Sequence, residues 1–194
     1  MRTAIEGAED DADAGAQDLL AHSITNCDVV VGITASGRTP YVLGAVQAAQ
    51  RAGATTVGIS NNDGSKLGSL VDIPIEVPVG PEVLAGSTRL KAGSAQKRVL
   101  NILTTATMVK LGKTYGNLMV DVSPTNEKLR ERAINLVTRI TGASEETALE
   151  TLVAAQWRVK VAATMLTHSI SPAEAEQVLA GKDGRLRLAL ADTK

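Results

Sequence analysis

Aromatic residues are nearly absent from this sequence. They make up 2% of the chain, with no Phe, one Trp and two Tyr. Single-stranded nucleic acids bind by stacking their bases on aromatic side chains, so a stacking platform of that kind is excluded. Because hydrophobic residues still make up 44% of the chain, the core is predicted to consist of Ala, Val, Leu and Ile.

The sequence also has little that suits a metal or a polyanion. A single Cys excludes an intrachain disulfide, and two His far apart in the chain argue against a zinc site. The net charge of -1 leaves no excess of cations for nucleic-acid phosphates. No apolar run approaches the roughly 20 residues that span a bilayer, and the acidic N-terminus lacks the apolar core of a signal peptide. These absences predict a soluble cytoplasmic protein without a nucleic-acid or membrane partner.

The 194 residues suffice for one domain of about 100–200 residues and a small appendage. A short acidic segment with helical character comes first, and the first predicted strand begins only near Asp28. Residues 29–33 are continuously apolar and rich in β-branched side chains. This pattern is typical of a strand that is buried on both faces of a parallel sheet.

A helix and a second strand follow directly. Thr39 and Pro40 suit the N-cap and the first position of a helix that stops at Gly53. Residues 55–60 then read as a strand. Strand, helix and strand within about 30 residues predict a βαβ unit, and therefore an α/β fold with a parallel sheet.

The next elements are a third strand and a long helix. Residues 73–79 contain Pro74 and Pro78, which lack N–H donors, so this strand is predicted at an edge of the sheet. Residues 88–112 form a helical pattern with a broad apolar face. So broad a face predicts burial on more than one side, including burial against a second subunit.

The rest of the chain reads as a compact appendage of three helices. The predicted helices span residues 126–140, 144–168 and 171–180. The chain is therefore divided into an α/β domain, residues 1–124, and a small helical domain, residues 125–194.

The first candidate site is the loop that joins the first strand to its helix. In open parallel sheets, ligands bind beyond the carboxyl ends of the strands. Here the hydroxyl groups of Thr34, Ser36 and Thr39 meet a helix N-terminus, which is a ready anion site. Gly37 permits close approach of the backbone, and Arg38 supplies a positive charge. An ordinary N-capped turn explains the same spacing.

The second candidate is the segment GPEVLAGSTRLKAGSAQK, residues 80–97. A carboxylate beside hydroxyl groups and cations suits a phosphorylated polyol. Gly93 lies inside an otherwise good helix at a cost of about 1 kcal/mol. The alternative is a capped, solvated helix start. The polar side chains concerned are Glu82, Ser87, Thr88, Arg89 and Lys91.

The third candidate is the acidic segment near the N-terminus. Glu6 and Glu9 are three residues apart, so they share a face if the segment is helical. A carboxylate beside an apolar wall is suited to acid or base catalysis. A solvated acidic helix start explains the same residues.

Together, and in this order, these segments resemble the N-acetylmuramic acid 6-phosphate etherases. That family shares the sugar isomerase (SIS) fold, a three-layer αβα domain, with the glucokinase regulatory proteins. Residues 80–97 match the family's signature almost throughout, and IEGAEDD, VVVGITASGRTPYV, TVGISNN and GNLMVDVSPTNEKL resemble its other blocks. The last three predicted helices resemble its small helical domain.

The resemblance implies a lyase of cell-wall sugar recycling that needs neither a metal nor a nucleotide. Such enzymes cleave the D-lactyl ether of N-acetylmuramic acid 6-phosphate and release N-acetylglucosamine 6-phosphate and D-lactate. It assigns a catalytic role to Glu9 rather than Glu6, and implies a homodimer with active sites near the interface. It assigns sugar-phosphate binding to Thr34, Ser36, Gly37, Arg38 and Thr39, with Glu82, Ser87, Arg89 and Lys91 added by the signature segment.

The sequence departs from the family pattern at its start. Family members have an earlier strand with a GTSGR-type loop, a second acidic residue and a further strand, and none of these is found here. We therefore expect a partial SIS domain that lacks its first strands, from a truncated chain, an internal start or a split gene. An etherase-like chain that is inactive alone, a non-catalytic sugar-phosphate-binding regulatory module and an aldose–ketose isomerase stay open. The etherase-type acidic block argues against the isomerase.

Overall fold

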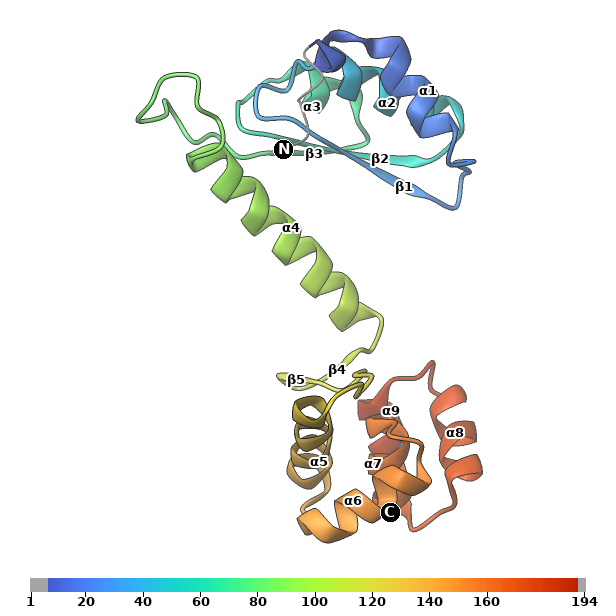
Figure 1. Ribbon diagram of the computed structural model, residues 1–194. Coiled ribbons are helices and arrows are strands. Elements are labelled where there is room, and N and C mark those ends of the chain that lie inside the picture. Colours follow the sequence, from blue (N-terminus) through green and yellow to red (C-terminus); the bar gives the residue numbers. More distant parts are fainter. Residues whose placement is uncertain (1–6, 192–194) are drawn as a thin grey trace. The chain divides into compact units, whose positions relative to one another are not determined.

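The computed structural model describes residues 7–191. It divides into two compact units between Ile102 and Leu103, which are coloured from blue to green and from green to red in Figure 1. The predicted domain limits, 1–124 and 125–194, stay a prediction.

The first unit contains a three-stranded sheet and its helices. All strands are parallel in the order β1-β2-β3, so strand, helix and strand form the predicted βαβ unit. The elements are the 3-10 helix η1 (Ala8–Asp10), α1 (Ala12–Leu20), β1 (Val29–Ile33), α2 (Pro40–Arg51), β2 (Thr55–Ser60), α3 (Lys66–Leu70), β3 (Ile73–Glu76) and α4 (Lys91–Lys110), which continues into the second unit.

Proline places β3 at the edge of this sheet, as predicted. Pro74 pairs with Gly58 of β2, and β3 has no further strand beside it in the described chain. The missing N–H group of Pro74 therefore interrupts no second ladder.

The prediction that the first strand is buried on both faces is wrong for this chain. Val29 is 63% exposed and Val31 is 39% exposed. Helices α1, α2 and α3 lie on one face of the sheet (Figure 1), and Gly32 meets Val42 and Val46 of α2 on that face. Since side chains alternate along a strand, Val29 and Val31 lie on the opposite face. The central strand β2 is buried along almost its whole length instead.

The second unit is helical with a short hairpin. Five helices follow the hairpin in the described residues, where three were predicted. The elements are β4 (Thr114–Tyr115), β5 (Leu118–Met119), α5 (Glu127–Thr141), α6 (Glu145–Ala154), α7 (Val159–His168), α8 (Pro172–Ala180) and α9 (Leu186–Leu190).

The difference arises mainly in the second predicted helix, which is broken into α6 and α7. Gln156 and Trp157 have φ angles of 53° and 61°, in the left-handed region. The backbone N–H group of Trp157 donates to Leu152 O at 2.7 Å, and this hydrogen bond closes the C-terminal end of α6. Its ring lies under the Arg130 guanidinium group at 5.0 Å, a cation–π contact with α5.

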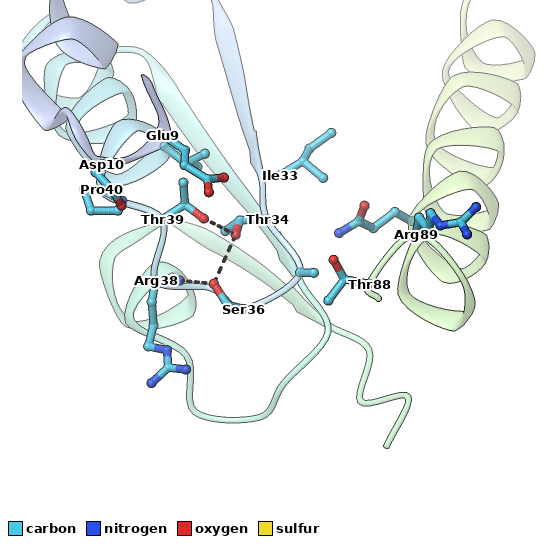
Figure 2. Close-up of a pocket in the computed structure, with 14 residues that line it drawn as sticks. Glu9, Asp10, Ile33, Thr34, Ser36, Arg38, Thr39, Pro40, Thr88 and Arg89 are labelled. Carbon is cyan, nitrogen blue, oxygen red and sulfur yellow. Dashed lines mark hydrogen bonds between the residues drawn. The ribbon is translucent and has the colours of Figure 1, made fainter. Parts of the chain in front are cut away.

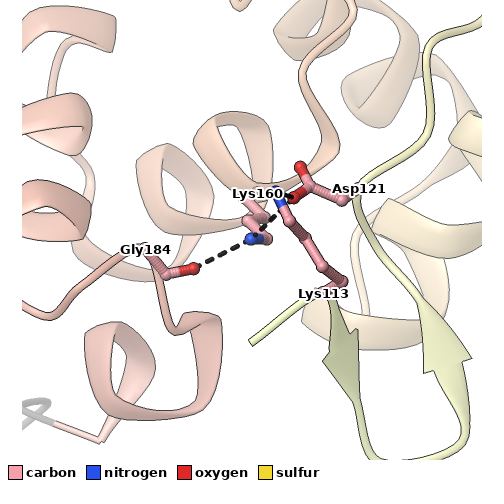
Figure 3. Close-up of polar contacts among 4 residues, drawn as sticks. All are labelled: Lys113, Asp121, Lys160 and Gly184. Atoms are coloured by element: carbon pink, nitrogen blue, oxygen red, sulfur yellow. Dashed lines mark hydrogen bonds and ion pairs between the residues drawn. The ribbon is translucent and has the colours of Figure 1, made fainter. Parts of the chain in front are cut away.

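A lysine of α7 joins three parts of the second unit. Lys160 Nζ donates to Asp121 Oδ2 at 3.2 Å and to Gly184 O at 2.9 Å, and Lys113 pairs with the same carboxylate at 2.5 Å. Figure 3 shows the Lys160 ammonium group between the carboxylate and the carbonyl group. The Lys160 side chain is only 12% exposed, so its charge is largely withdrawn from water and is compensated by these acceptors.

The long helix α4 is shorter than predicted and mostly exposed. It begins at Lys91 rather than near residue 88, and Ala92 is its buried residue in the described chain. Ile102 is 67% exposed and Met108 is 50% exposed, so its apolar face is not buried in the single chain. No helix in residues 7–191 combines the length and the hydropathy that crossing a membrane requires.

Candidate active site

A pocket of about 710 Å³ lies at the carboxyl end of β1, within the first unit (Figure 2). Its walls come from η1, from the loop between β1 and α2, and from the start of α4. The lining residues are Glu9, Asp10, Ile33, Thr34, Ala35, Ser36, Arg38, Thr39, Pro40, Val42, Thr88, Arg89, Gly93 and Gln96.

Three hydroxyl groups lie together in this pocket. Thr34 Oγ1 is 2.6 Å from Thr39 Oγ1 and 3.4 Å from Ser36 Oγ. The Arg38 N–H group donates to Ser36 Oγ at 3.2 Å. Since Thr34 is almost completely buried, the cluster is fixed at its inner end. These oxygens form a small polar surface that both donates and accepts hydrogen bonds.

The N-terminus of α2 opens at the same cluster. Thr39 is its N-cap residue and Pro40 its first residue, as predicted, but the Thr39 side chain makes no capping hydrogen bond. The first turn of a helix has unsatisfied N–H groups and the positive end of the helix dipole. A negatively charged group beside the three hydroxyl groups is therefore stabilised there.

Two carboxylates and two guanidinium groups line the pocket. Glu9 and Asp10 come from η1, and Arg38 and Arg89 come from opposite walls. In Figure 2 the Glu9 carboxylate points toward the Thr34 and Thr39 hydroxyl groups, whereas the Arg38 guanidinium group extends away from them. The Glu9 carboxylate is thus directed at the hydroxyl cluster.

Seven of the candidate residues named from the sequence line this one pocket, although they come from three separate segments. They are Glu9, Thr34, Ser36, Arg38, Thr39, Thr88 and Arg89. Gly37 belongs to the same loop, but it packs against Ser65 and does not line the pocket. Ser87 does not line this pocket, and Glu6 lies outside the described residues. The binding and catalytic roles of these residues stay predictions.

Glu82 and Lys91 make local contacts at the start of α4. The Glu82 carboxylate accepts from the N–H groups of Lys91 and Ala92, each at 3.0 Å. Lys91 Nζ donates to Val79 O at 2.8 Å. The amides of Ala92 and Lys91 lower the pKa of Glu82. Neither residue lines the pocket. The contacts of Glu82 suggest that it caps the start of α4, and the sugar-phosphate binding assigned to Glu82 and Lys91 stays a prediction.

Two polar side chains that line the pocket, those of Asp10 and Gln96, were not named as candidates from the sequence. Asp10 follows Glu9 directly, and Gln96 lies three residues after Gly93 on α4. Residues three apart lie on the same face of a helix, so the spacing from Gly93 to Gln96 was the sequence feature that could have indicated Gln96 as a lining residue. The Gln96 amide group donates to Asn61 Oδ1 at 2.9 Å, which ties α4 to the loop after β2.

The chain matches two known protein families. Residues 10–106, half of the chain, match the SIS domain, and residues 116–182 match the C-terminal lid domain of glucokinase regulatory protein.

Similar proteins confirm the resemblance to the etherases. N-acetylmuramic acid 6-phosphate etherase of Cutibacterium acnes is 53% identical over 190 residues, which cover 98% of this chain and 62% of that protein. The etherase of Rubrobacter xylanophilus is 56% identical over 96% of this chain and 62% of its own length. Etherase 2 of Lactiplantibacillus plantarum is 51% identical over 98% and 64%. The chain thus spans less than two thirds of these relatives, and its matched half places it in the SIS domain family.

Proposed function

We propose that this chain acts on N-acetylmuramic acid 6-phosphate as an etherase-like lyase. The products are N-acetylglucosamine 6-phosphate and D-lactate. The observation that carries the proposal is the single pocket that combines the Glu9 carboxylate, three hydroxyl groups and the N-terminus of α2. The identity of about 50% to etherases supports the choice of substrate.

In this proposal Glu9 is the base that starts the elimination. The proton at C2 of the sugar becomes removable once the ring opens to its aldehyde. Glu9 takes this proton, the electron pair of the C2–H bond forms a C2–C3 double bond, and the lactate oxygen leaves C3 with the electrons of the ether bond and takes up a proton from solvent. Water then adds to the double bond: its oxygen joins C3 and releases a proton to solvent, and Glu9 returns its proton to C2, which gives the second product and restores the carboxylate.

The hydroxyl cluster holds the phosphate in this proposal. Thr34, Ser36 and Thr39 supply hydrogen bonds, and the dipole of α2 favours the negative charge. A phosphate far from the reacting carbons supplies binding energy that orients the sugar against the base.

The direct test measures D-lactate release from N-acetylmuramic acid 6-phosphate, with the C. acnes relative as the positive control. Turnover by this chain is expected to fall roughly 100-fold to 10,000-fold in Glu9→Gln, the usual contribution of a general base. Asp13→Asn is the matched control, because Asp13 is an exposed carboxyl in the first turn of α1 that does not line the pocket. Equal, measurable turnover by Glu9→Gln and wild type would remove Glu9 from the mechanism. No turnover by the wild-type chain would support an etherase-like chain that is inactive alone.

A regulatory module that binds a sugar phosphate without converting it is the second candidate. The match of residues 116–182 to the lid domain of glucokinase regulatory protein favours it. Calorimetry with N-acetylglucosamine 6-phosphate, run beside the lactate assay, separates the two. Binding without turnover, in a version that also carries the upstream strands, supports regulation, and turnover supports the lyase.

We also propose a homodimer located in the cytoplasm. The exposed apolar side chains Ile102, Met108 and Val109 of α4 support self-association, because burying them removes apolar surface from water. Sedimentation is expected to give twice the mass of 20.1 kDa. A monomer at micromolar concentration would contradict the dimer.

A further inference from the structure

The loop that carries the hydroxyl cluster is held by residues 61–67, which run from the end of β2 into the first turn of α3. Asn61 N and Asn62 Nδ2 both donate to Ala35 O at 3.0 Å. Leu67 N donates to Gly37 O at 3.0 Å. None of the three donors lines the pocket. The backbone of the hydroxyl loop is therefore fixed by residues that do not reach a ligand.

The two loops are also in close contact at one point. A Cβ atom on Gly37 would overlap Ser65 Cβ and lie 2.8 Å from Ser65 Oγ. Ser65 is buried, and its hydroxyl group accepts from Gly68 N at 2.9 Å and from Ser60 Oγ at 3.1 Å. A displacement of Ser65 is thus transmitted to Gly37, because no free volume separates them.

One carboxylate fixes this supporting loop from its other side. Glu76 is the last residue of β3, and its two oxygens accept from Gly64 N and Ser65 N, each at 2.8 Å. Hydrogen bonds from the Ser65 hydroxyl group and from the Ser65 and Gly64 amides lower the pKa of Glu76. The side chain is therefore an anion at neutral pH, and charge-assisted hydrogen bonds of this kind are stronger than neutral ones.

We propose that Glu76 is a positioning residue for the pocket. Its carboxylate fixes the amides of Gly64 and Ser65, and so keeps residues 61–67 in contact with Ala35 and Gly37. These contacts in turn fix the position of the hydroxyl cluster. Glu76 does not line the pocket, so its effect on a ligand is indirect. The inference rests on the proposed function only in taking a sugar phosphate as the ligand. Binding groups must be held within about 0.5 Å of the productive geometry, so a small displacement of the loop weakens binding.

The chain offers a matched control at the opposite end of the strands. Asp72, just before β3, accepts from Thr56 N and Thr56 Oγ1, each at 2.8 Å. Like Glu76, it is an acceptor for a backbone amide of a neighbouring segment, and its pKa is lowered in the same direction, chiefly by the Thr56 amide. Thr56 lies at the amino end of β2, away from the pocket. Asp72→Asn therefore reports the loss of a structural carboxylate alone.

The experiment compares Glu76→Gln and Asp72→Asn with the wild-type chain. Urea unfolding measures stability, and calorimetry measures the Kd for N-acetylglucosamine 6-phosphate. Both variants are expected to lose stability, whereas only Glu76→Gln raises the Kd, by roughly tenfold. Asn62→Ala serves as a milder second variant, because Asn62 is exposed and loses only its bond to Ala35 O. It is expected to raise the Kd with little loss of stability.

Equal Kd values for Glu76→Gln, Asn62→Ala and wild type would overturn the inference, as would an equal rise in Asp72→Asn. If the wild-type chain does not bind the probe, the proposed function fails, and hydrogen exchange still tests the inference. The amides of Leu67 and Arg38, bonded to Gly37 O and Ser36 Oγ, are then followed. Faster exchange in Glu76→Gln but not in Asp72→Asn supports the positioning role, and unchanged rates overturn it.

Discussion

Thr39 occupies the N-cap position of α2, yet its hydroxyl group is bonded to the Thr34 side chain at 2.6 Å. A capping side chain normally accepts from an amide of the first helical turn. Here the hydroxyl group lies in the pocket, and the first turn keeps its donors for another partner. At this residue the sequence correctly predicts the helix boundary, whereas the direction of the side chain depends on Thr34, five residues earlier.

Gly37 provides a test at the scale of one residue. Its φ of 68° lies in the left-handed region, and a Cβ atom there would overlap Ser65. Gly37→Ala is expected to lower the free energy of unfolding by about 3 kcal/mol, from backbone strain and overpacking together. Urea unfolding measures this loss.

Gly64 supplies the control for that substitution. Its φ of 60° is similar, but nothing lies within 4 Å of a Cβ atom built there. Gly64→Ala is expected to cost only about 1 kcal/mol, the backbone part alone. Equal losses in the two alanine variants would show that contact with Ser65 contributes nothing. Adding Ser65→Gly to Gly37→Ala should restore part of the stability.

At the scale of elements, local patterns predict more than tertiary surroundings do. The βαβ unit and the edge position of β3 follow from residues close in sequence, such as Pro40 and Pro74. The exposure of Val29 depends on what covers the second face of the sheet, which no local pattern specifies. The break between α6 and α7 contains neither Gly nor Pro, and it is formed by Gln156 and Trp157 in the left-handed conformation. The sequence therefore has no helix-breaking residue at this point.

The same limit applies to the candidate site. The hydroxyl loop and Glu9 could be predicted because each lies in a recognisable segment. That Gln96 joins them, and that Glu76 supports the loop from behind, depends on strands and helices meeting in space. These contacts are separated by 35 residues in the first case and by 11 in the second, beyond the reach of helix or strand periodicity.

The start of α4 is the element on which Glu82 is tested. Glu82→Gln removes the negative charge that faces the Lys91 and Ala92 amides. These two amides are expected to exchange hydrogen faster, because an uncharged amide oxygen accepts more weakly and no longer complements the helix dipole. Hydrogen exchange followed by mass spectrometry measures the change.

Asp63→Asn is the control for Glu82→Gln, since it neutralises an exposed loop carboxyl in the same unit. It should leave both amides unchanged. If Glu82→Gln instead weakens sugar-phosphate binding without altering exchange, the binding role predicted for Glu82 is supported and the capping role is contradicted.

At the scale of the molecule, acid is expected to weaken the second unit through Asp121. Burial alone would raise the pKa of Asp121, but hydrogen bonds from Lys113 and Lys160 together outweigh burial and lower it from 3.8. A carboxyl with a lowered pKa stabilises the fold above its unfolded pKa, and this stability is lost as the pH falls through the folded value. The free energy of unfolding should therefore decrease below about pH 4.

Circular dichroism during urea unfolding at several pH values measures this loss. Asp121→Asn should be less stable than wild type at pH 7 and should show a shallower decrease in acid. Glu150→Gln, a substitution of an exposed carboxyl on α6, should keep the wild-type dependence. Parallel curves for Asp121→Asn and wild type would mean that this ion-pair cluster does not contribute to acid sensitivity.

The scarcity of aromatic residues makes Trp157 a natural optical probe. It is the single tryptophan of the chain, and it lies in the second unit under Arg130, whereas the candidate pocket lies in the first. Tryptophan emission, excited selectively at the red edge of the absorption band, therefore reports on residues 103–194 without any label. A change in that emission when a sugar phosphate binds would be a direct optical signal that binding in the first unit alters the second unit.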